Sequence, residues 1–420
     1  MSHFDIRCRK CNKILVDTYC AFCEHCVDSL LLTEYKEKKF LTNGPGEGIW
    51  KFNWTPVHSP LSEVPSPLVY RSEGLADALG LDELHIIFNG YWPERGATVE
   101  SCTFKEYEAA MVLENAREND IEGLVVASAG NTARAFAHLA YKTGFPALIV
   151  VPLMCLDEMW YLEASDKTPT FVVSDGDYSD AIDMAKRIAL ASGMPFEGGV
   201  KNIAKRDGLG VVFLEAVRVM GRLPDHHFQA VGSGAGAIAA WEMSERFQGD
   251  QRYRGRMPKL HLAQNLPFAP MVKAWSRRER TLREEDLSPA LISEISTRVL
   301  STRYPAYSLQ GGVFDALKAT EGHAYGVTNE EVLAAGELFK RTEGIDITAA
   351  AAVAVGALKQ SIEMKNVGRE DNILLNITGG GESNIRAEGR VNPVKGIYIS
   401  KRASETELKE AICTTLNRTC

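Results

Sequence analysis

Lys105 is the residue of this sequence whose type and position best suit covalent chemistry. It lies near the start of a predicted helix that covers residues 103–118. The positive end of a helix dipole disfavours a second positive charge, so this position lowers the pKa of the amine and favours its neutral form. A neutral lysine amine can form a Schiff base with a carbonyl compound. An ordinary exposed lysine fits the same local sequence, so the prediction depends on what surrounds Lys105.

Two segments of small residues are predicted to bind anions, because each follows a predicted strand and precedes a predicted helix. The first could hold a phosphate, although it has neither the Walker nor the dinucleotide-binding spacing, and a plain tight turn is the alternative. The second suits a carboxylate, and the amide of Asn131 suits a phenolic or carbonyl oxygen. An asparagine that only caps the helix is the alternative there. The two segments are Gly232, Ser233, Gly234, Ala235 and Gly236, and Ser128, Ala129, Gly130, Asn131 and Thr132.

A third segment, Thr378 followed by three glycines, ends a predicted strand at 372–377. Glycines at the end of a strand indicate that another group approaches the backbone closely, unless the segment is only a flexible turn. In open parallel sheets, ligands bind at the carboxyl ends of the strands, where these segments are predicted to lie. We therefore expect the three segments to form one site with Lys105.

The N-terminal cysteines are predicted to form a metal site of a different kind. Cys8, Cys11, Cys20 and Cys23 form a C-x2-C-x8-C-x2-C pattern, which is typical of a small zinc ribbon. In such a ribbon the metal supplies folding energy that a short segment lacks. Cys26 leaves the ligand set ambiguous, and a ribbon with reduced, empty thiols is the alternative.

Strands and helices are predicted to alternate from residue 68 onward, which indicates β-α-β units and a doubly wound α/β fold. At 420 residues the chain is long enough for two sizeable domains, since single cores stop growing near roughly 250–300 residues. The predicted strands cover residues 84–88, 123–127, 147–151, 170–173, 228–231, 259–264 and 372–377. Further helices are predicted at 179–192, 207–220 and 237–247, with one more that ends before residue 144.

Composition excludes several classes of partner. The net charge of −8 argues against nucleic acid or an anionic membrane surface as a partner held by bulk electrostatics. The longest apolar run, at 145–156, is too short to span a bilayer, which needs about 20 residues. The polar stretch at 1–13 lacks the apolar core of a signal peptide. We therefore expect a cytoplasmic protein with small-molecule partners.

Taken together, these features resemble the fold-type-II pyridoxal-phosphate enzymes, and specifically the threonine-synthase family. The motifs keep the order of that family from the Cys-rich start through Pro67-Leu68 and Phe88-Asn89-Gly90 to Lys105, the Ser-x-Gly-Asn-Thr loop and Thr378. The resemblance implies two doubly wound domains of the tryptophan synthase β-like kind, and a homo-oligomer that is a dimer or a trimer. The implied parts are a Cys-rich ribbon at 1–34, a large cofactor-binding domain at 35–104 and 200–420, and a small inserted α/β domain at 105–199.

The resemblance also implies pyridoxal 5′-phosphate as the cofactor. Lys105 would carry it, Asn131 would bond its ring oxygen, and Thr378 would bond its pyridine nitrogen. The 232–236 segment would hold the cofactor phosphate, and the 128–132 loop would hold the carboxylate of the substrate.

One departure from the family pattern bears on the substrate. Threonine synthases usually read Gly-Ser-Phe-Lys-Asp-Arg at the lysine, whereas this chain reads Cys102-Thr103-Phe104-Lys105-Glu106. Other segments resemble a branch of the family, found in methanogenic archaea, that converts O-phospho-L-serine and sulfite to L-cysteate and phosphate on a route to coenzyme M. We expect that reaction. These segments are 90–96, 127–137, 224–234 and 262–268.

Both the leaving group and the nucleophile of that reaction are oxyanions, so the site needs a further cation. The segment at 202–208 resembles the part of threonine synthases that contacts substrate phosphate, which makes Lys205 or Arg206 the expected cation. Two alternatives stay open: a threonine synthase that acts on O-phosphohomoserine, and a non-catalytic sensor with a zinc ribbon. The presence of Lys105, Asn131 and Thr378 together argues against the sensor.

Overall fold

The larger of two parallel sheets has six strands and leads into two of the predicted site segments. The computed structural model describes residues 3–15, 19, 21–163 and 169–416. Within it, five neighbouring strands of this sheet run parallel, and β4 at one edge is antiparallel. In spatial order the strands are β14 (His323–Val327), β13 (Lys259–Asn265), β12 (His226–Ala230), β15 (Asn372–Ile377), β5 (Glu83–Phe88) and β4 (Leu68–Arg71).

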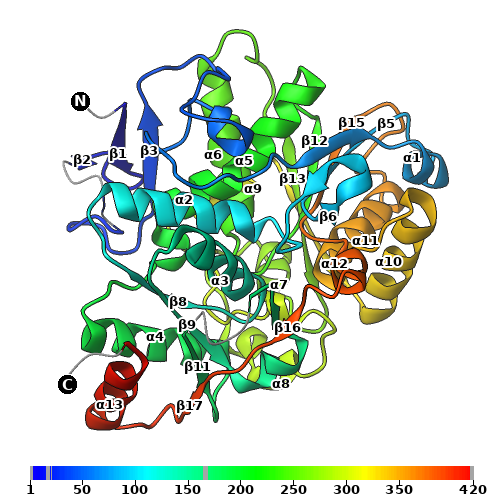
Figure 1. Cartoon of the computed structure of the whole chain (residues 1–420). Coiled ribbons are helices and arrows are strands. Elements are labelled where there is room, and N and C mark those ends of the chain that lie inside the picture. The colour runs from blue at the N-terminus through cyan, green and yellow to red at the C-terminus, as the bar shows by residue number, and fades with distance from the viewer. Residues whose placement is uncertain (1–2, 16–18, 20, 164–168, 417–420) are drawn as a thin grey trace.

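Helices cover both faces of this sheet (Figure 1), which explains why the side chains of its inner strands are buried on both sides. On one face α11 packs against β12, β13, β14 and β15, and α10 packs on α11. The other face carries α5, α6 and α9. A capping box between Thr328 and Glu331 starts α10, and Gly344 ends it in a left-handed conformation. The helices of this part are α1 (Gly74–Leu79), α5 (Ile203–Met220), α6 (Ala235–Gly249), α9 (Val313–Ala319), α10 (Asn329–Glu343) and α11 (Ala349–Glu363).

The smaller sheet has four parallel strands, and its side chains alternate between two cores. Val125 and Val150 pack with α4 and α13, whereas Val126 and Ile149 belong to the core that contains α3. This alternation places the helices on opposite faces of the sheet. Its strands are β17 (Ile397–Ile399), β11 (Thr170–Val173), β9 (Ala147–Pro152) and β8 (Leu124–Ala127), and its helices are α3 (Asn131–Thr143), α4 (Tyr178–Ser192) and α13 (Glu405–Leu416).

The C-terminal end of the chain differs from the expected division into domains. Residues 397–420 were expected in the large domain, but β17 pairs with β11 of the smaller sheet. The helix α13 then packs against α4 (Figure 1). The reason is a strand pairing between distant parts of the sequence, which local patterns do not reveal.

The helix α2 (Lys105–Glu118) joins the two parts of the molecule, because it packs against both α5 and α3. It is buried on nearly all sides, including three glutamates at positions 106, 108 and 114. Its first residue is Lys105. Lys105 therefore lies at the start of a helix whose position is determined by its packing against both parts of the molecule.

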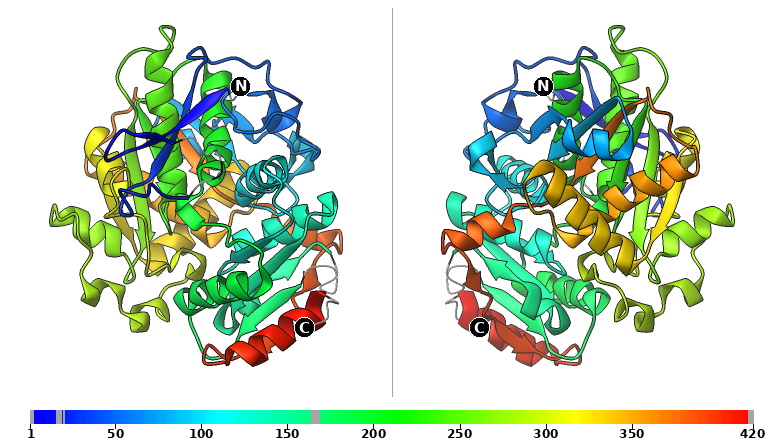
Figure 2. Two further views of the ribbon diagram at one scale, coloured as in Figure 1. Left: turned by 90° about the vertical axis from the view of Figure 1, so that its left-hand side faces the viewer. Right: turned by 90° about the vertical axis from the view of Figure 1, so that its right-hand side faces the viewer.

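The N-terminal segment forms a small antiparallel sheet that crosses α5 and α6 (Figure 2). Its strands are β1 (Phe4–Cys8), β2 (Ile14–Leu15) and β3 (Leu31–Tyr35). The remaining elements are short and are β6 (Tyr91–Trp92), β7 (Ala97–Thr98), β10 (Trp160–Tyr161), β16 (Asn392–Pro393), α7 (Pro270–Ser276), α8 (Pro289–Ile292) and α12 (Glu382–Ala387). Among the described residues, no helix combines the length and the apolar character that crossing a membrane requires.

The doubly wound α/β fold predicted from the sequence is confirmed, with one boundary that matters for the site. The helix predicted at 207–220 begins at Ile203, because the side chain of Asn202 accepts hydrogen bonds from the N–H groups of residues 204 and 205. This cap adds a turn to α5. It places Lys205 in the first turn rather than in a preceding loop.

We expect acid to destabilise the fold partly through His227, which is buried on β12. Burial lowers the pKa of this imidazole to about 4, from an ordinary value of 6.5. In the unfolded chain the group takes up a proton near pH 6.5, so its contribution to stability is complete above that pH and is lost as the pH falls toward 4. The shift corresponds to about 3 kcal/mol. His227→Gln should therefore flatten the fall of the urea midpoint between pH 6.5 and 4.

The matched control for that measurement is His58→Gln, because His58 is exposed. If His227→Gln and His58→Gln give the same pH dependence as the unsubstituted protein, burial of His227 does not contribute to acid sensitivity.

Candidate active site

One pocket between the two sheets collects nearly all the residues that the sequence singled out. It lies at the carboxyl ends of β8, β12 and β15, as expected for an open α/β sheet. The predicted residues that line it are Lys105, Ser128, Ala129, Gly130, Asn131, Thr132, Lys205, Gly232, Ser233, Gly234, Ala235, Gly236 and Thr378.

The 232–236 segment forms a close-fitting turn between β12 and α6. Gly234 is the N-cap residue of α6 and has a φ of 86°, a left-handed conformation that favours glycine. A Cβ on Gly234 would lie 2.3 Å from Cγ2 of Val313, and one on Gly236 would lie 2.3 Å from Nε2 of Gln229. Because glycine has no side chain with which to cap the helix, the start of α6 offers its N–H groups to an anion in the pocket.

The 128–132 loop is held in shape by its own serine. The Oγ of Ser128 accepts hydrogen bonds from the N–H groups of Gly130 (3.0 Å) and Ala133 (2.9 Å). Asn131 is the first residue of α3, and Gly130 is the N-cap. The amide of Asn131 therefore does not act as the helix cap that was its alternative role, and its side chain lines the pocket.

The glycines after Thr378 allow the backbone of residues 378–380 to pack closely on the backbone of residues 102–104. The N–H of Phe104 donates to the carbonyl of Thr378 (3.0 Å), and the N–H of Gly380 donates to the carbonyl of Cys102 (3.1 Å). A Cβ on Gly379 would lie 2.6 Å from the carbonyl oxygen of Cys102. The group whose close approach the sequence predicted is therefore the backbone of the loop that precedes Lys105.

The amine of Lys105 is largely buried, and its Nζ lies 2.7 Å from Oε2 of Glu108. Burial lowers the pKa of this lysine from its ordinary value, and the negative charge of Glu108 opposes the shift. The direction agrees with the expectation from the sequence, but the main cause is burial rather than the helix dipole. A lowered pKa leaves more of the amine neutral near pH 7, and the neutral amine is the form that acts as a nucleophile or a base.

A second lysine lies in the same pocket and is held in its charged form. The Nζ of Lys205 lies 3.1 Å from Oε1 of Glu108 and 3.2 Å from Oε1 of Glu197. Burial disfavours the charge on Lys205, but attraction by the two carboxylates outweighs burial and raises the pKa of the lysine. Lys205 is therefore a fixed cation beside Lys105.

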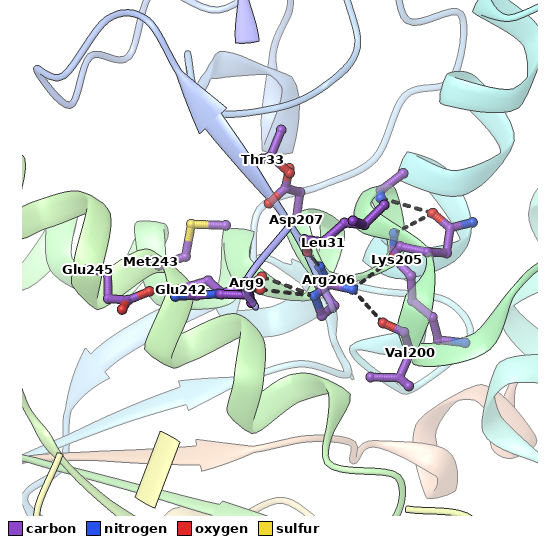
Figure 3. Close-up of polar contacts among 12 residues, drawn as sticks. Arg9, Leu31, Thr33, Val200, Lys205, Arg206, Asp207, Glu242, Met243 and Glu245 are labelled. Carbon is purple, nitrogen blue, oxygen red and sulfur yellow. Dashed lines mark hydrogen bonds and ion pairs between the residues drawn. The ribbon is translucent and has the colours of Figure 1, made fainter. Parts of the chain in front are cut away.

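Arg206 does not line the pocket, which corrects the expectation that it could bind the substrate anion (Figure 3). Its Nε lies 3.2 and 3.1 Å from the two carboxylate oxygens of Glu242. Its Nη2 donates to the carbonyl of Leu31 in the N-terminal sheet. Successive residues of a helix point about 100° apart, and here Lys205 points into the pocket whereas Arg206 points toward Glu242.

Sequence reasoning missed the two glutamates of this cluster. Glu108 lies three residues after Lys105 on α2, a spacing at which helical side chains meet, so that signal was present. Glu197 belongs to the loop before α5, and no local pattern connects it with α2. The far side of the pocket is also lined by Val299, Leu300 and Thr302, which no motif marks.

The N-terminal cysteines form a cluster with a different fourth member from the one expected. The sulfurs of Cys8, Cys11, Cys23 and Cys26 all lie within 4.8 Å of one another. Cys26 thus occupies the place that the sequence pattern assigned to Cys20, and Cys20 lies outside the described residues. Among the described cysteines of the N-terminal segment, these four form the set whose sulfurs lie close enough to bind one ion.

Comparison with known sequences identifies the family. The pattern of a family described as "Pyridoxal-phosphate dependent enzyme" matches residues 67–379, a range that contains Lys105 and every other segment of the pocket. The chain belongs to this family. Pyridoxal phosphate is the cofactor of the enzyme, as the sequence predicted.

Curated relatives of the enzyme carry a more specific name. The cysteate synthase of Methanocella arvoryzae is 45% identical to it over 94% of this chain and 96% of the relative. The cysteate synthase of Methanosarcina acetivorans is 45% identical over 92% of this chain and 94% of the relative.

Solved structures that resemble the enzyme confirm its fold. A pyridoxal 5′-phosphate-dependent aspartate racemase has a TM-score of 0.58 at 17% identity and covers 76% of this chain and 91% of its own. Threonine deaminase isoform 2 from Solanum lycopersicum has a TM-score of 0.58 at 16% identity and covers 77% and 86%. At these identities the likeness concerns the fold alone.

The pocket of the enzyme fits the cofactor on structural grounds. The turn at 232–236 consists of small residues, its Gly234 and Gly236 are packed too closely against their neighbours for a Cβ, and it presents a helix N-terminus. The amine of Lys105 lies in the same pocket, together with the hydroxyl-bearing Thr378 and the amide-bearing Asn131. A phosphate, an aldehyde and a heteroaromatic ring therefore each find a suitable group.

We expect Gly234→Ala to weaken pyridoxal phosphate binding by at least about tenfold, or 1.4 kcal/mol. The added methyl group meets Val313 and forces the turn to move, and the left-handed backbone is strained by any Cβ. Titration of the apoenzyme, followed by absorbance, measures the change.

Gly80→Ala is the matched control, because Gly80 has a φ of 70° but no atom within 4 Å of its added Cβ. It carries the same backbone strain far from the pocket and should leave the cofactor affinity unchanged. Equal cofactor affinities for Gly234→Ala and Gly80→Ala would contradict a phosphate cradle at 232–236.

Proposed function

We propose that the protein is a cysteate synthase, which replaces the phosphate of O-phospho-L-serine by sulfite and releases L-cysteate and phosphate. The single observation that carries the choice of an anionic substrate is Lys205, a second lysine of the pocket that is held in its charged form. The 232–236 turn accounts for one phosphate, that of the cofactor, so Lys205 is left for a second oxyanion. The names of the relatives at 42–45% identity support the same reaction.

The residues that would hold the cofactor are those on which the pocket is built. The N–H groups at 232–236 would bind its phosphate, Asn131 its ring oxygen, and Lys105 its aldehyde carbon. Thr378 offers a hydroxyl to the ring nitrogen and has no negative charge that would hold a proton there. When bound, pyridoxal phosphate supplies an electron sink for the pair left at Cα of the substrate.

Lys105 would move the proton in this reaction. Once its Nζ is free, this amine can take the proton from Cα of O-phospho-L-serine, because burial has lowered its pKa. The Cβ–O bond to phosphate then breaks, and a Cβ–S bond to sulfite forms in its place. The proton returns to Cα from Nζ, so the amine ends the cycle as it began.

Lys205 and the 128–132 loop would bind the two ends of the substrate. The start of α3 offers backbone N–H groups to the substrate carboxylate. Lys205 offers its ammonium group to the departing phosphate and then to the incoming sulfite. Glu108 touches both lysines and donates no proton in its charged form, so it would orient the two amines.

We expect purified protein with O-phospho-L-serine and sulfite to yield L-cysteate and phosphate in equal amounts, as measured by mass spectrometry and a phosphate assay. Lys105→Ala should lower turnover at least about a hundredfold, because it removes the base. It should also abolish the borohydride-stable label that the unsubstituted protein acquires on Lys105.

Threonine formed from O-phosphohomoserine as the main activity would show that the protein is a threonine synthase instead. A protein that binds the cofactor at Lys105 but turns over neither phosphorylated substrate would be a sensor. Protein that stays colourless with pyridoxal phosphate would contradict both enzyme assignments.

We expect Lys205→Gln to raise the KM for O-phospho-L-serine roughly 10- to 100-fold, which corresponds to loss of a charged hydrogen bond worth about 1.5–3 kcal/mol. The amide can still donate to Glu108 and Glu197, so the absorbance of bound cofactor should persist and report an intact pocket. Lys186→Gln on the exposed face of α4 is the control. An unchanged KM for Lys205→Gln, with cofactor bound, would exclude Lys205 from substrate binding.

A further inference from the structure

The four N-terminal sulfurs have the arrangement of a metal site. Zinc–thiolate bonds of about 2.3 Å in a tetrahedron place the sulfurs about 3.8 Å apart. The sulfurs of Cys11 and Cys23 lie 3.8 Å apart, and all four sulfurs lie within 4.8 Å of one another. The two pairs, Cys8 with Cys11 and Cys23 with Cys26, share the C-x2-C spacing.

Backbone turns hold each pair in place. The N–H of Asn12 donates to the carbonyl of Cys8 (3.0 Å), and Asn12 has a left-handed φ of 59°. The N–H of Cys26 donates to the carbonyl of Cys23 (3.1 Å). Such a turn directs both sulfurs of a pair toward one point. The turns contain too few residues to form a hydrophobic core of their own, so a bound metal would supply folding energy.

The small sheet that carries these cysteines is attached to the start of α5 (Figure 3). The hydroxyls of Thr33 and Tyr35 on β3 each donate to Oδ2 of Asp207 at 2.8 Å. The carbonyl of Leu31, also on β3, accepts from Arg206. Both partners on α5 are buried, so these bonds form in a region that water does not reach.

A second contact ties the same sheet to α6 and to the loop before α5. The Nη2 of Arg9 lies 2.6 Å from Oε2 of Glu245 and 3.8 Å from Oε1 of Glu242. Glu242 in turn is the carboxylate that holds Arg206. The Nζ of Lys201 donates to the carbonyl of Val27 at 3.2 Å.

The residue next to this attachment is Lys205, which lines the pocket. Arg206 and Asp207 belong to the same turn of α5, so a shift of the small sheet would move that turn and the Cα of Lys205 with it. Glu197 and Glu108 fix the far end of the Lys205 side chain, but not its Cα.

We propose that Cys8, Cys11, Cys23 and Cys26 bind one Zn²⁺ ion, and that the ion holds the N-terminal sheet against the first turn of α5 and thereby positions Lys205. Arg206 and Asp207 are the positioning residues that transmit the attachment. The assignment of the metal is independent of the reaction, whereas its effect on the substrate rests on the proposed function of Lys205.

The metal is tested on the full-length protein by elemental analysis and by exchange of zinc for Co²⁺. We expect one zinc per chain, and a Co²⁺ derivative with the charge-transfer absorption of thiolate ligation. Cys11→Ser and Cys26→Ser should lose the metal, whereas Cys20→Ser and Cys155→Ser should keep it. The Co²⁺ spectrum uses the unsubstituted protein, so it decides the question even if a serine variant fails to fold.

Protein that holds no zinc and gives no thiolate–Co²⁺ absorption would overturn the site. Loss of metal in Cys20→Ser, with retention in Cys26→Ser, would overturn the ligand set.

The positioning role is tested by hydrogen exchange and kinetics on the same protein before and after removal of zinc. We expect amides at 203–207 to exchange at least about tenfold faster without the metal, as local opening becomes easier. The KM for O-phospho-L-serine should rise severalfold while pyridoxal phosphate stays bound.

Unchanged exchange and KM after removal of zinc would overturn the positioning role. If the zinc-loaded protein does not turn over O-phospho-L-serine at all, the proposed function fails, whereas zinc content and exchange still decide the metal site and the attachment.

Discussion

Two lysines and two glutamates are buried together where α2, α5 and the loop before α5 meet, and the site depends on this cluster. Charges removed from water must be paired, because an unpaired buried charge costs several kcal/mol. Glu108 contacts both lysines, and Glu197 contacts Lys205 alone. This unequal sharing separates the two amines: the pKa of Lys105 is lowered by burial, and that of Lys205 is raised by two carboxylates. One pocket thus holds a base and a fixed cation.

The cluster can form only because α2 begins at a defined point. The backbone that leads into Lys105 is held by Gly379, which approaches the carbonyl of Cys102 too closely for any side chain, and by Gly380, whose N–H donates to the same carbonyl. Cys102 itself has a φ of 55°, at the position where threonine synthases have glycine. A non-glycine residue in that conformation is strained, so the surrounding contacts of the loop must hold it. The strand β15, its glycines and the lysine loop therefore act as one rigid unit.

The two helices of the cluster are anchored from different sides. The helix α2 packs against α3 of the smaller sheet and against α5 of the larger part, so both sheets determine where Lys105 lies. The start of α5 is attached to the N-terminal sheet through Arg206 and Asp207. The N-terminal sheet thus contacts the same turn of α5 that carries Lys205. This arrangement gives the N-terminal segment a structural reason to accompany the catalytic fold.

The sequence alone indicated the order of strand, small-residue loop and helix, the place of Lys105 near the start of a helix, and the pyridoxal-phosphate family. These features are local: a glycine-rich turn after a strand and a lysine at a helix start are visible within about ten residues. Tertiary structure decided which of two neighbouring cations faces the pocket, since helix α5 begins at Ile203 and turns Arg206 toward Glu242. It also decided that Glu197 joins Glu108, that Cys26 completes the thiolate cluster, and that β17 belongs to the smaller sheet. Each of these features depends on a contact between residues that are distant in sequence. The sequence around either residue does not indicate which residue it will contact.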